Sequence, residues 1–168
     1  MAHVASNLTF NPDPNLTVTS TVAFVENALE SAAKEPSIKR FVYCSSSSAA
    51  TQHKVNEKFD LTFDSWNEED VARAWAPPPY TMDRLLPSYN ASKVQGEQAF
   101  WKFIKERKPG FVGNAVLPDF VLGLPPKPNK QGLGPSGTVS YFESTGKATK
   151  ALPWAATRQL FIFVGHAS

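Results

Sequence analysis

Hydrophobic positions along the chain form helix-like and strand-like stretches that alternate. Two runs of aromatic and β-branched residues, 38–44 and 111–117, predict buried strands. A helix is predicted before the first run, ending ahead of Pro36, because these apolar residues repeat at helical spacing: Val18, Val22, Val25, Leu29 and Ala32. A second helix is expected from its candidate cap Ser88 to the helix breakers at 108–110. This alternation predicts an α/β fold.

Other stretches are polar or rich in proline and glycine. Residues 51–88 include the proline run 77–79, which excludes a helix interior or a central strand, so we predict an irregular segment there. Residues 125–137 predict a loop by composition, and residues 138–146 predict a short helix.

Residues that can carry chemistry gather near the first strand and the second helix. The serine run 45–48 begins where strand 38–44 should end, at the edge of a parallel sheet where ligands bind. Tyr89 and Lys93 are four residues apart, so on a helix they project from one face. A phenol has a pKa of about 10, and a cation beside it lowers that value. A nearby serine hydroxyl would hold a carbonyl oxygen in line for the phenol proton, so the set predicts carbonyl reduction.

Composition and charge narrow the class of protein. The 17 basic and 15 acidic side chains give a net charge of +2 and are scattered, which argues against a nucleic-acid partner. Cys44 is the single cysteine, so no disulfide can form within the chain, as suits a reducing compartment. No segment has the length of a membrane span or the pattern of a signal peptide. We therefore expect a cytoplasmic protein without a membrane partner.

The remaining titratable residues are given structural interpretations. The histidines show no metal-ligand spacing, so no metal site is predicted at His3, His53 or His166. We assign Glu97 and Glu106 to a solvated helix face. The acidic run 68–70 is interpreted as a helix start or an exposed turn.

Five stretches carry a family resemblance: residues 3–6, 25–32, 39–46, 89–102 and 114–123. In order and spacing they resemble the extended short-chain dehydrogenase/reductase family, in its branch of fungal aldehyde and ketone reductases, which is related to dihydroflavonol reductases and cinnamoyl-CoA reductases. The resemblance implies a partial Rossmann-like, doubly wound parallel sheet. Residues 1–124 would form the C-terminal half of an NAD(P)-binding Rossmann domain with the active-site helix. Residues 125–168 would begin a divergent or truncated substrate-binding region.

The same resemblance implies three catalytic roles. Tyr89 would protonate the alkoxide as hydride arrives from NADPH, and Lys93 would bond the nicotinamide ribose and depress the pKa of Tyr89. Ser46 would hold the oxygen of a small-molecule carbonyl substrate, with Ser45 and Ser47 as alternatives one residue away.

The cofactor contacts also follow from the resemblance. Tyr89 and Lys93 would bind the cofactor together with Ala5, Ser6, Pro118 and Val121. NADP(H) is the expected cofactor and NAD is possible. Asp119 stands where the family has an asparagine-like position, a change that could alter one hydrogen bond.

The Gly-rich turn of the family, G-x-x-G-x-x-G, does not occur in the sequence, and residues 1–6 resemble the end of the fourth strand of the sheet. We therefore expect a fragment without the N-terminal half of the cofactor domain. Two alternatives to a reductase stay open. One is an inactive fragment or pseudoenzyme that binds no cofactor, and the other is an NAD-dependent sugar-nucleotide epimerase or dehydratase, which shares the Tyr and Lys pair.

Overall fold

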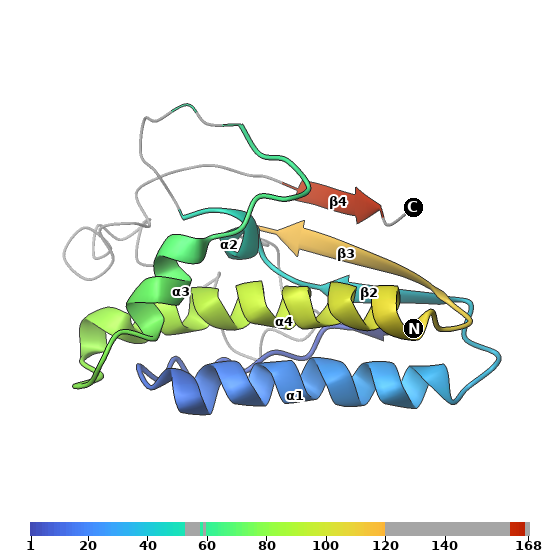
Figure 1. Ribbon diagram of the computed structural model, residues 1–168, viewed down its shortest axis with the longest axis horizontal. Coiled ribbons are helices and arrows are strands. Elements are labelled where there is room, and N and C mark those ends of the chain that lie inside the picture. The colour runs from blue at the N-terminus through green and yellow to red at the C-terminus, as the bar shows by residue number, and fades with distance from the viewer. Residues whose placement is uncertain (53–57, 59, 120–161, 167–168) are drawn as a thin grey trace, which may run out of the picture.

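The computed structural model describes residues 1–52, 58 and 60–119, together with the backbone of residues 162–166 (Figure 1). The loop predicted at 125–137, the helix predicted at 138–146 and the candidate residues His53 and Val121 lie outside the described residues.

Four strands form one sheet in the order β1-β2-β3-β4. The strands β1 (Ala2–His3), β2 (Arg40–Cys44) and β3 (Val112–Pro118) are parallel. The fourth strand, β4 (Ile162–His166), runs antiparallel to β3, and no pattern in the sequence predicted it. The parallel α/β sheet and the strands expected at 38–44 and 111–117 are confirmed.

Two long helices carry most of the remaining structure. The first, α1 (Pro14–Ala33), begins where the Asp13 side chain accepts a hydrogen bond from Asn15 N at 2.9 Å, and Pro14 occupies its first turn. The second, α4 (Leu85–Arg107), ends at Lys108, whose φ of 43° is left-handed. Both helices were predicted from the apolar spacing, and their existence is confirmed.

The predicted start of α4 is wrong by one turn. Ser88 does not cap the helix but lies inside it, fully buried, and its hydroxyl donates to Pro12 O at 2.8 Å. A serine hydroxyl can satisfy a distant carbonyl as well as a helix end, so the residue type alone did not fix the boundary.

The segment predicted to be irregular also contains helices. The helix α3 (Glu68–Ala74) lies within 51–88, and the 3-10 turn η1 (Met82–Arg84) leads into α4. Just before this segment, the short helix α2 (Ser47–Ala50) follows β2. Asn67 caps α3 by accepting from Asp70 N at 3.2 Å, so the helix start proposed for the acidic run is confirmed.

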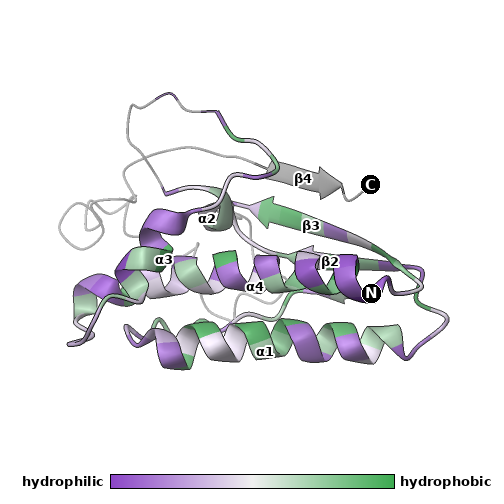
Figure 2. Ribbon diagram, viewed as in Figure 1, coloured by the Kyte–Doolittle hydropathy of each residue, from purple (hydrophilic) through white to green (hydrophobic). Residues whose placement is uncertain are grey.

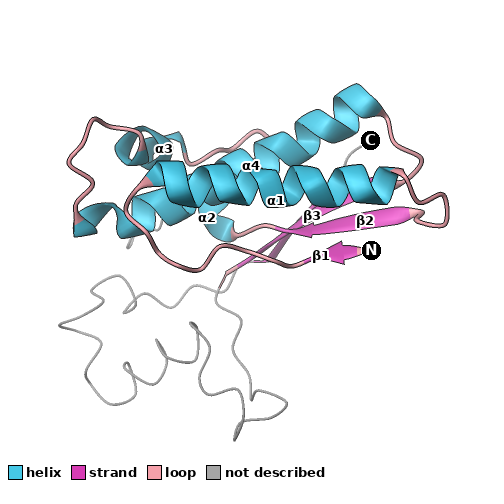
Figure 3. Cartoon of the chain, turned by 90° about the horizontal axis from the view of Figure 1, so that it is seen from below, coloured by secondary structure: helices cyan, strands magenta, loops and turns pink. Residues whose placement is uncertain are grey.

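The helices α1 and α4 lie side by side on one face of the sheet, and no described helix covers the other face (Figures 1 and 3). Hydrophobic and hydrophilic residues are interspersed along both helices, as expected for helices with one buried side (Figure 2). Between helices and sheet, Phe100 of α4 packs against Phe41 and Tyr43 of β2, with ring centroids 6.0 and 5.6 Å apart.

Close approach between layers depends on glycine at Gly96. A Cβ there would lie 2.8 Å from the Tyr43 hydroxyl oxygen and 3.4 Å from Thr21 Cγ2. The absence of a side chain therefore lets α4 approach both β2 and α1, which sets the depth at which the next helical residues sit against the sheet.

Candidate active site

The carboxyl ends of β1, β2 and β3 meet at one edge of the sheet because the three strands are parallel. Ala5 and Ser6 follow β1, Ser46 follows β2, and Pro118 is the last residue of β3. The structure thus brings these four candidate residues, distant in sequence, to the same edge.

Ser46 links β2 to α2 with an extended backbone, φ −157° and ψ 152°, and its side chain is 8% exposed. Its hydroxyl oxygen accepts from Ser48 N at 3.3 Å, which caps α2. The hydroxyl proton remains available for donation, and Ser46 acts to lower the pKa of the Tyr89 phenol.

Tyr89 and Lys93 occupy consecutive turns of α4. The Lys93 Nζ atom lies 5.7 Å from the centroid of the Tyr89 ring, so the two side chains share one face as the spacing predicted. The Lys93 side chain is 4% exposed, and no carboxylate of the described residues lies within ion-pair distance of it. Burying an ammonium group without a direct ion pair costs free energy.

Burial moves the acidity of both residues. It raises the pKa of Tyr89, while a hydrogen bond with Ser46 acts in the opposite direction and Cys44 adds to the rise. Burial lowers the pKa of Lys93, whereas Cys44 and Glu97 raise it and offset part of that effect. On balance the pKa of Tyr89 is raised, because desolvation of the phenol is the largest effect, and the expectation that Lys93 lowers this pKa stays a prediction.

Glu97 does not lie on a solvated face, and that assignment is corrected. Its side chain is 5% exposed, and its Oε1 accepts from Trp101 Nε1 at 3.2 Å. Burial raises its pKa, and Ser45, Trp101 and Lys93 partly offset the rise. The sequence held a signal for this position, since Glu97 comes one turn after Lys93 on the helix. Glu106 is exposed, as predicted.

The candidate cofactor residues differ in their surroundings. Ala5 is exposed, whereas the Ser6 hydroxyl oxygen is buried and finds no hydrogen-bond partner within the described part of the chain. Asp119, directly after Pro118, accepts from Ser47 Oγ at 3.3 Å. The Asp119 carboxylate therefore ties the end of β3 to α2 beside the serine run.

Phe10 is a site residue that the sequence analysis missed. Its ring centroid lies 5.3 Å from that of Tyr89, and its φ of 48° is left-handed, which is rare for an aromatic residue. The loop that holds it is fixed to α1, since Asn7 Nδ2 donates to Ser20 Oγ at 2.8 Å. No local pattern marks Phe10, because its place depends on contacts with α1 and α4.

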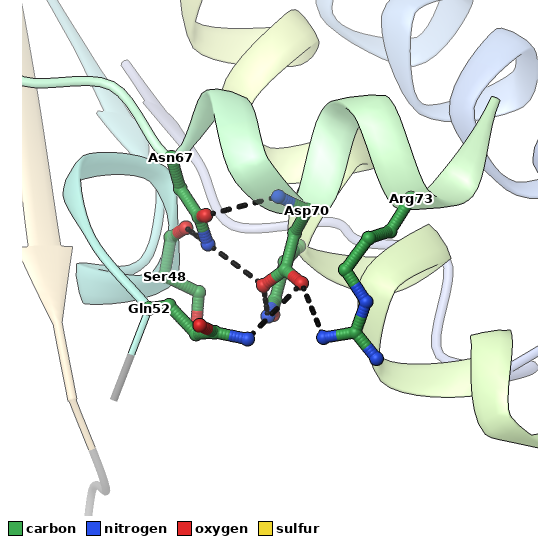
Figure 4. Close-up of polar contacts among 6 residues, drawn as sticks. Ser48, Gln52, Asn67, Asp70 and Arg73 are labelled. Atoms are coloured by element: carbon green, nitrogen blue, oxygen red, sulfur yellow. Dashed lines mark hydrogen bonds and ion pairs between the residues drawn. The ribbon is translucent and has the colours of Figure 1, made fainter. Parts of the chain in front are cut away.

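A buried carboxylate ties the neighbouring helices together. Asp70, 1% exposed, accepts from Asn67 Nδ2 at 2.9 Å and from Asn90 Nδ2 at 2.7 Å. Asn67 Nδ2 also donates to Ser48 O at 3.1 Å, and Arg73 reaches the same carboxylate from the rim (Figure 4). Because Asn90 is adjacent to Tyr89, this cluster fixes α2, α3 and the reactive turn of α4 to one another.

Two features are absent from the described residues. No described helix is long and apolar enough to cross a membrane. No group of three or more His, Cys, Asp or Glu side chains in the described ranges is arranged to hold a metal ion.

Curated relatives match most of this chain. It is 44% identical over 123 residues to the NAD-dependent epimerase/dehydratase terH of Aspergillus terreus, covering 73% of this chain and 36% of that protein. It is 39% identical to the NAD-dependent epimerase/dehydratase tndE of Aspergillus flavipes over 92% of this chain and 43% of that one. It is 40% identical to aldehyde reductase 2 of Sporidiobolus salmonicolor, covering 82% and 40% of the two chains.

The chain belongs to the extended short-chain dehydrogenase/reductase family. It spans less than half the length of the curated relatives just described. No family model matches it.

Solved reductases share the fold. A reductase engineered to attenuate substrate inhibition in asymmetric catalysis superposes with a TM-score of 0.68 at 24% identity, covering 85% of this chain and 44% of that one. The yeast methylglyoxal/isovaleraldehyde reductase Gre2, solved in complex with NADPH, gives a TM-score of 0.61 at 21% identity, covering 86% and 41%. At these identities the likeness establishes the Rossmann-type fold.

Proposed function

We propose that this chain carries the proton-transfer residues of an NADPH-dependent reductase that converts an aldehyde or ketone to an alcohol. Ser46, Tyr89 and Lys93 are its catalytic residues. The observation that supports this assignment is their convergence at the carboxyl edge of the sheet, with Ser46 acting to lower the pKa of the Tyr89 phenol and Lys93 Nζ 5.7 Å from its ring.

Each residue has a distinct chemical task. The Ser46 hydroxyl and the Tyr89 phenol both donate to the carbonyl oxygen of the substrate, which polarises the carbonyl. Hydride reaches the carbonyl carbon from reduced nicotinamide when the cofactor is bound. The resulting alkoxide takes the Tyr89 proton and leaves as the alcohol, and the phenolate is protonated again from water. A phenol whose pKa is raised by burial stays protonated at neutral pH, as an acid must.

Two polar groups fit the nicotinamide end of a cofactor. The Lys93 ammonium lies at the edge without a direct ion pair in the described residues, and the buried Ser6 hydroxyl has no protein partner there. Lys93 would hold the ribose hydroxyls and keep positive charge near the Tyr89 phenolate as it forms. NADP(H) is favoured over NAD because Gre2 was solved with NADPH.

Cofactor binding is the first test. NADPH is titrated by fluorescence into the purified chain, with Lys93→Ala as the variant and Lys102→Ala, exposed on the same helix, as the matched control. Saturable binding that Lys93→Ala weakens and Lys102→Ala leaves alone supports the proposal. A folded chain that binds no NADPH overturns it, and the alternative of an inactive chain lacking the Gly-rich turn then holds.

Turnover is the second test. With an aldehyde and ketone panel, Tyr89→Phe should slow NADPH oxidation by about 10²- to 10⁴-fold, the usual contribution of a general acid, and leave NADPH binding intact. Tyr80→Phe is the control, because Tyr80 interacts with Asn15 and Arg84 away from the serine run. Equal rates for Tyr89→Phe and the unmodified chain would exclude Tyr89 as the acid.

A second candidate function is that of a sugar-nucleotide epimerase or dehydratase, favoured by the names of the terH and tndE relatives. Such an enzyme restores its cofactor in each cycle, whereas a reductase consumes it. Net oxidation of NADPH in proportion to alcohol formed would decide for the reductase.

A further inference from the structure

A ladder of four side chains continues from the catalytic pair along α4. Tyr89, Lys93, Glu97 and Trp101 are each separated by four residues, so successive members lie one turn apart on the same face. The proposed chemistry uses only the first two. Glu97 is nevertheless 5% exposed, and a carboxyl group is rarely so buried unless it is paired.

The contacts of Glu97 account for only one of its two oxygens. Oε1 accepts from Trp101 Nε1 at 3.2 Å. Oε2 is buried and forms no hydrogen bond of normal geometry with any described residue, and the same is true of Ser45 Oγ. The remaining buried oxygen of Glu97 is therefore not engaged by a hydrogen bond within the described residues, and Glu97 lies one helical turn after the equally buried Lys93.

The other groups around Lys93 offer no equivalent negative charge. The Lys93 charge lowers the pKa of His3 of β1, which carries no negative charge. Tyr89 lies one helical turn before Lys93 and is a phenol, and Cys44 of β2 is a thiol. Asp119, after β3, is bonded to Ser47. At Gly96, between Lys93 and Glu97 in sequence and beside Glu97, the nearest atoms of α1 belong to the uncharged Thr21 and Val25.

We propose that Glu97 is a positioning residue for the reduction proposed above: one helical turn after Lys93 and buried with it, its carboxylate keeps Lys93 charged. The inference rests on the proposed function. An ammonium loses hydration when it is buried, and a carboxylate in the same low-polarity interior offsets part of that loss even without direct contact.

Lys93 titration tests this directly and needs no enzymatic activity. The full chain is labelled with ¹³C and ¹⁵N lysine, and the Lys93 side-chain signal, identified by its loss in Lys93→Met, is followed by NMR from neutral to alkaline pH. In Glu97→Gln, Lys93 should lose its proton at a lower pH than in the unmodified chain. Glu106→Gln, an exposed position on the same helix, should leave the midpoint where it was. An unmoved midpoint in Glu97→Gln overturns the proposal.

If Glu97→Gln does not fold, the variant Lys93→Met tests the same coupling from the other side. Coupling between two sites is mutual, so Lys93→Met, which removes the cation, should raise the pKa of Glu97. The Glu97 side chain is followed by NMR in chains labelled with ¹³C glutamate, with and without Lys93→Met. A Glu97 titration that is identical with and without Lys93 also overturns the proposal.

NADPH titration separates this inference from the proposed function. The NADPH titration is run at a pH between the Lys93 titration midpoint of Glu97→Gln and that of the unmodified chain. At this pH, Glu97→Gln should bind NADPH about threefold to tenfold more weakly than the unmodified chain, a range typical of coupling between neighbouring residues. A shifted Lys93 titration in a chain that never binds NADPH would overturn the function and retain the Glu97–Lys93 coupling. Normal NADPH binding with an unmoved titration would do the reverse.

Discussion

Burial, more than any single charge, sets the chemistry of the residues at the sheet edge. Tyr89 and Lys93 both move toward their neutral forms, the phenol because its pKa rises and the ammonium because its pKa falls. The first shift suits the proposed role of Tyr89 as an acid. The proposed role of Lys93 as a cation requires compensation for the second shift, and Glu97 acts in that direction.

His3 should make the protein less stable in mild acid. Burial and the Lys93 charge hold its pKa below the ordinary value of 6.5, so the unfolded chain takes up a proton before the folded one does. The stability this group contributes is complete above pH 6.5 and is lost as the pH falls through the folded pKa. Urea unfolding between pH 7.5 and pH 5 should show a falling free energy of unfolding.

The variant His3→Gln isolates that contribution. The raised pKa of Glu97 gives the opposite slope above pH 4.5, so the sign must be read from the difference between variant and unmodified chain. We expect the difference to be constant near pH 8 and to shift in favour of His3→Gln on acidification. Parallel curves across the whole range would contradict this assignment.

Gly113 should tolerate no side chain. A Cβ there would lie 2.8 Å from Ile104 Cδ1 and 2.9 Å from Phe100 Cζ, both packed in the core. Gly113→Ala should therefore lower the free energy of unfolding by about 1–3 kcal/mol through overpacking, measured by urea unfolding. Gly110→Ala is the control, since no atom lies within 4 Å of its Cβ position, and its stability should stay within about 0.5 kcal/mol.

The sequence located the reactive residues but not the buried acids. Spacing was enough to place Tyr89 and Lys93 on one helix face, because that relation is local. Glu97 carried one local signal, its place one turn after Lys93, but burial is set by contacts with elements distant in sequence, as between Asp70 and Asn90 of α4, and the sequence does not show these contacts. The roles of Ser46, Tyr89 and Lys93 remain predictions.

At the scale of elements, predictability followed the strength of the hydrophobic pattern. The helices α1 and α4 and the strands β2 and β3 have long or dense apolar runs, and all four were predicted from them. The short helix α3 was indicated only by its acidic first turn, because it is largely polar and is held through Asn67 and Asp70 as well as by the small apolar contacts of Val71 and Ala74. Side-chain hydrogen bonds to other helices leave no periodic signal in the sequence.

The hydrogen bonds of Asp70 with Asn67 and Asn90 should contribute much of the stability with which α3 packs against α4. Asp70→Ala leaves the Asn67 and Asn90 amides without their acceptor in a buried site, which should cost about 3–5 kcal/mol of the free energy of unfolding. Arg73→Ala removes only a rim partner, 49% exposed, and should cost under about 1 kcal/mol. Urea unfolding of both variants checks this, and similar losses would mean that Asp70 acts through its exposed ion pair.

At the scale of the whole molecule, the described sheet has one covered face and two edge strands, β1 and β4, and no described strand lies on the outer side of β1. Val4, directly after β1, is 72% exposed, and unpaired strand edges with apolar neighbours promote pairing between chains. We therefore expect the purified chain to associate as its concentration rises, with sedimentation velocity as the measurement.

A pair of lysine substitutions locates that association. Val4→Lys adds a charge beside the β1 edge, where it should oppose pairing and shift the chain toward the monomer. Leu16→Lys adds the same charge at a position on α1 that is 58% exposed, on the helical side of the molecule, and should leave the association constant nearly unchanged. Equal effects of the two variants would indicate association driven by net charge or by the helical face. If only Val4→Lys weakens association, the chains pair along the edge strand β1, which is followed by Ala5 and Ser6, two of the residues proposed to hold the cofactor.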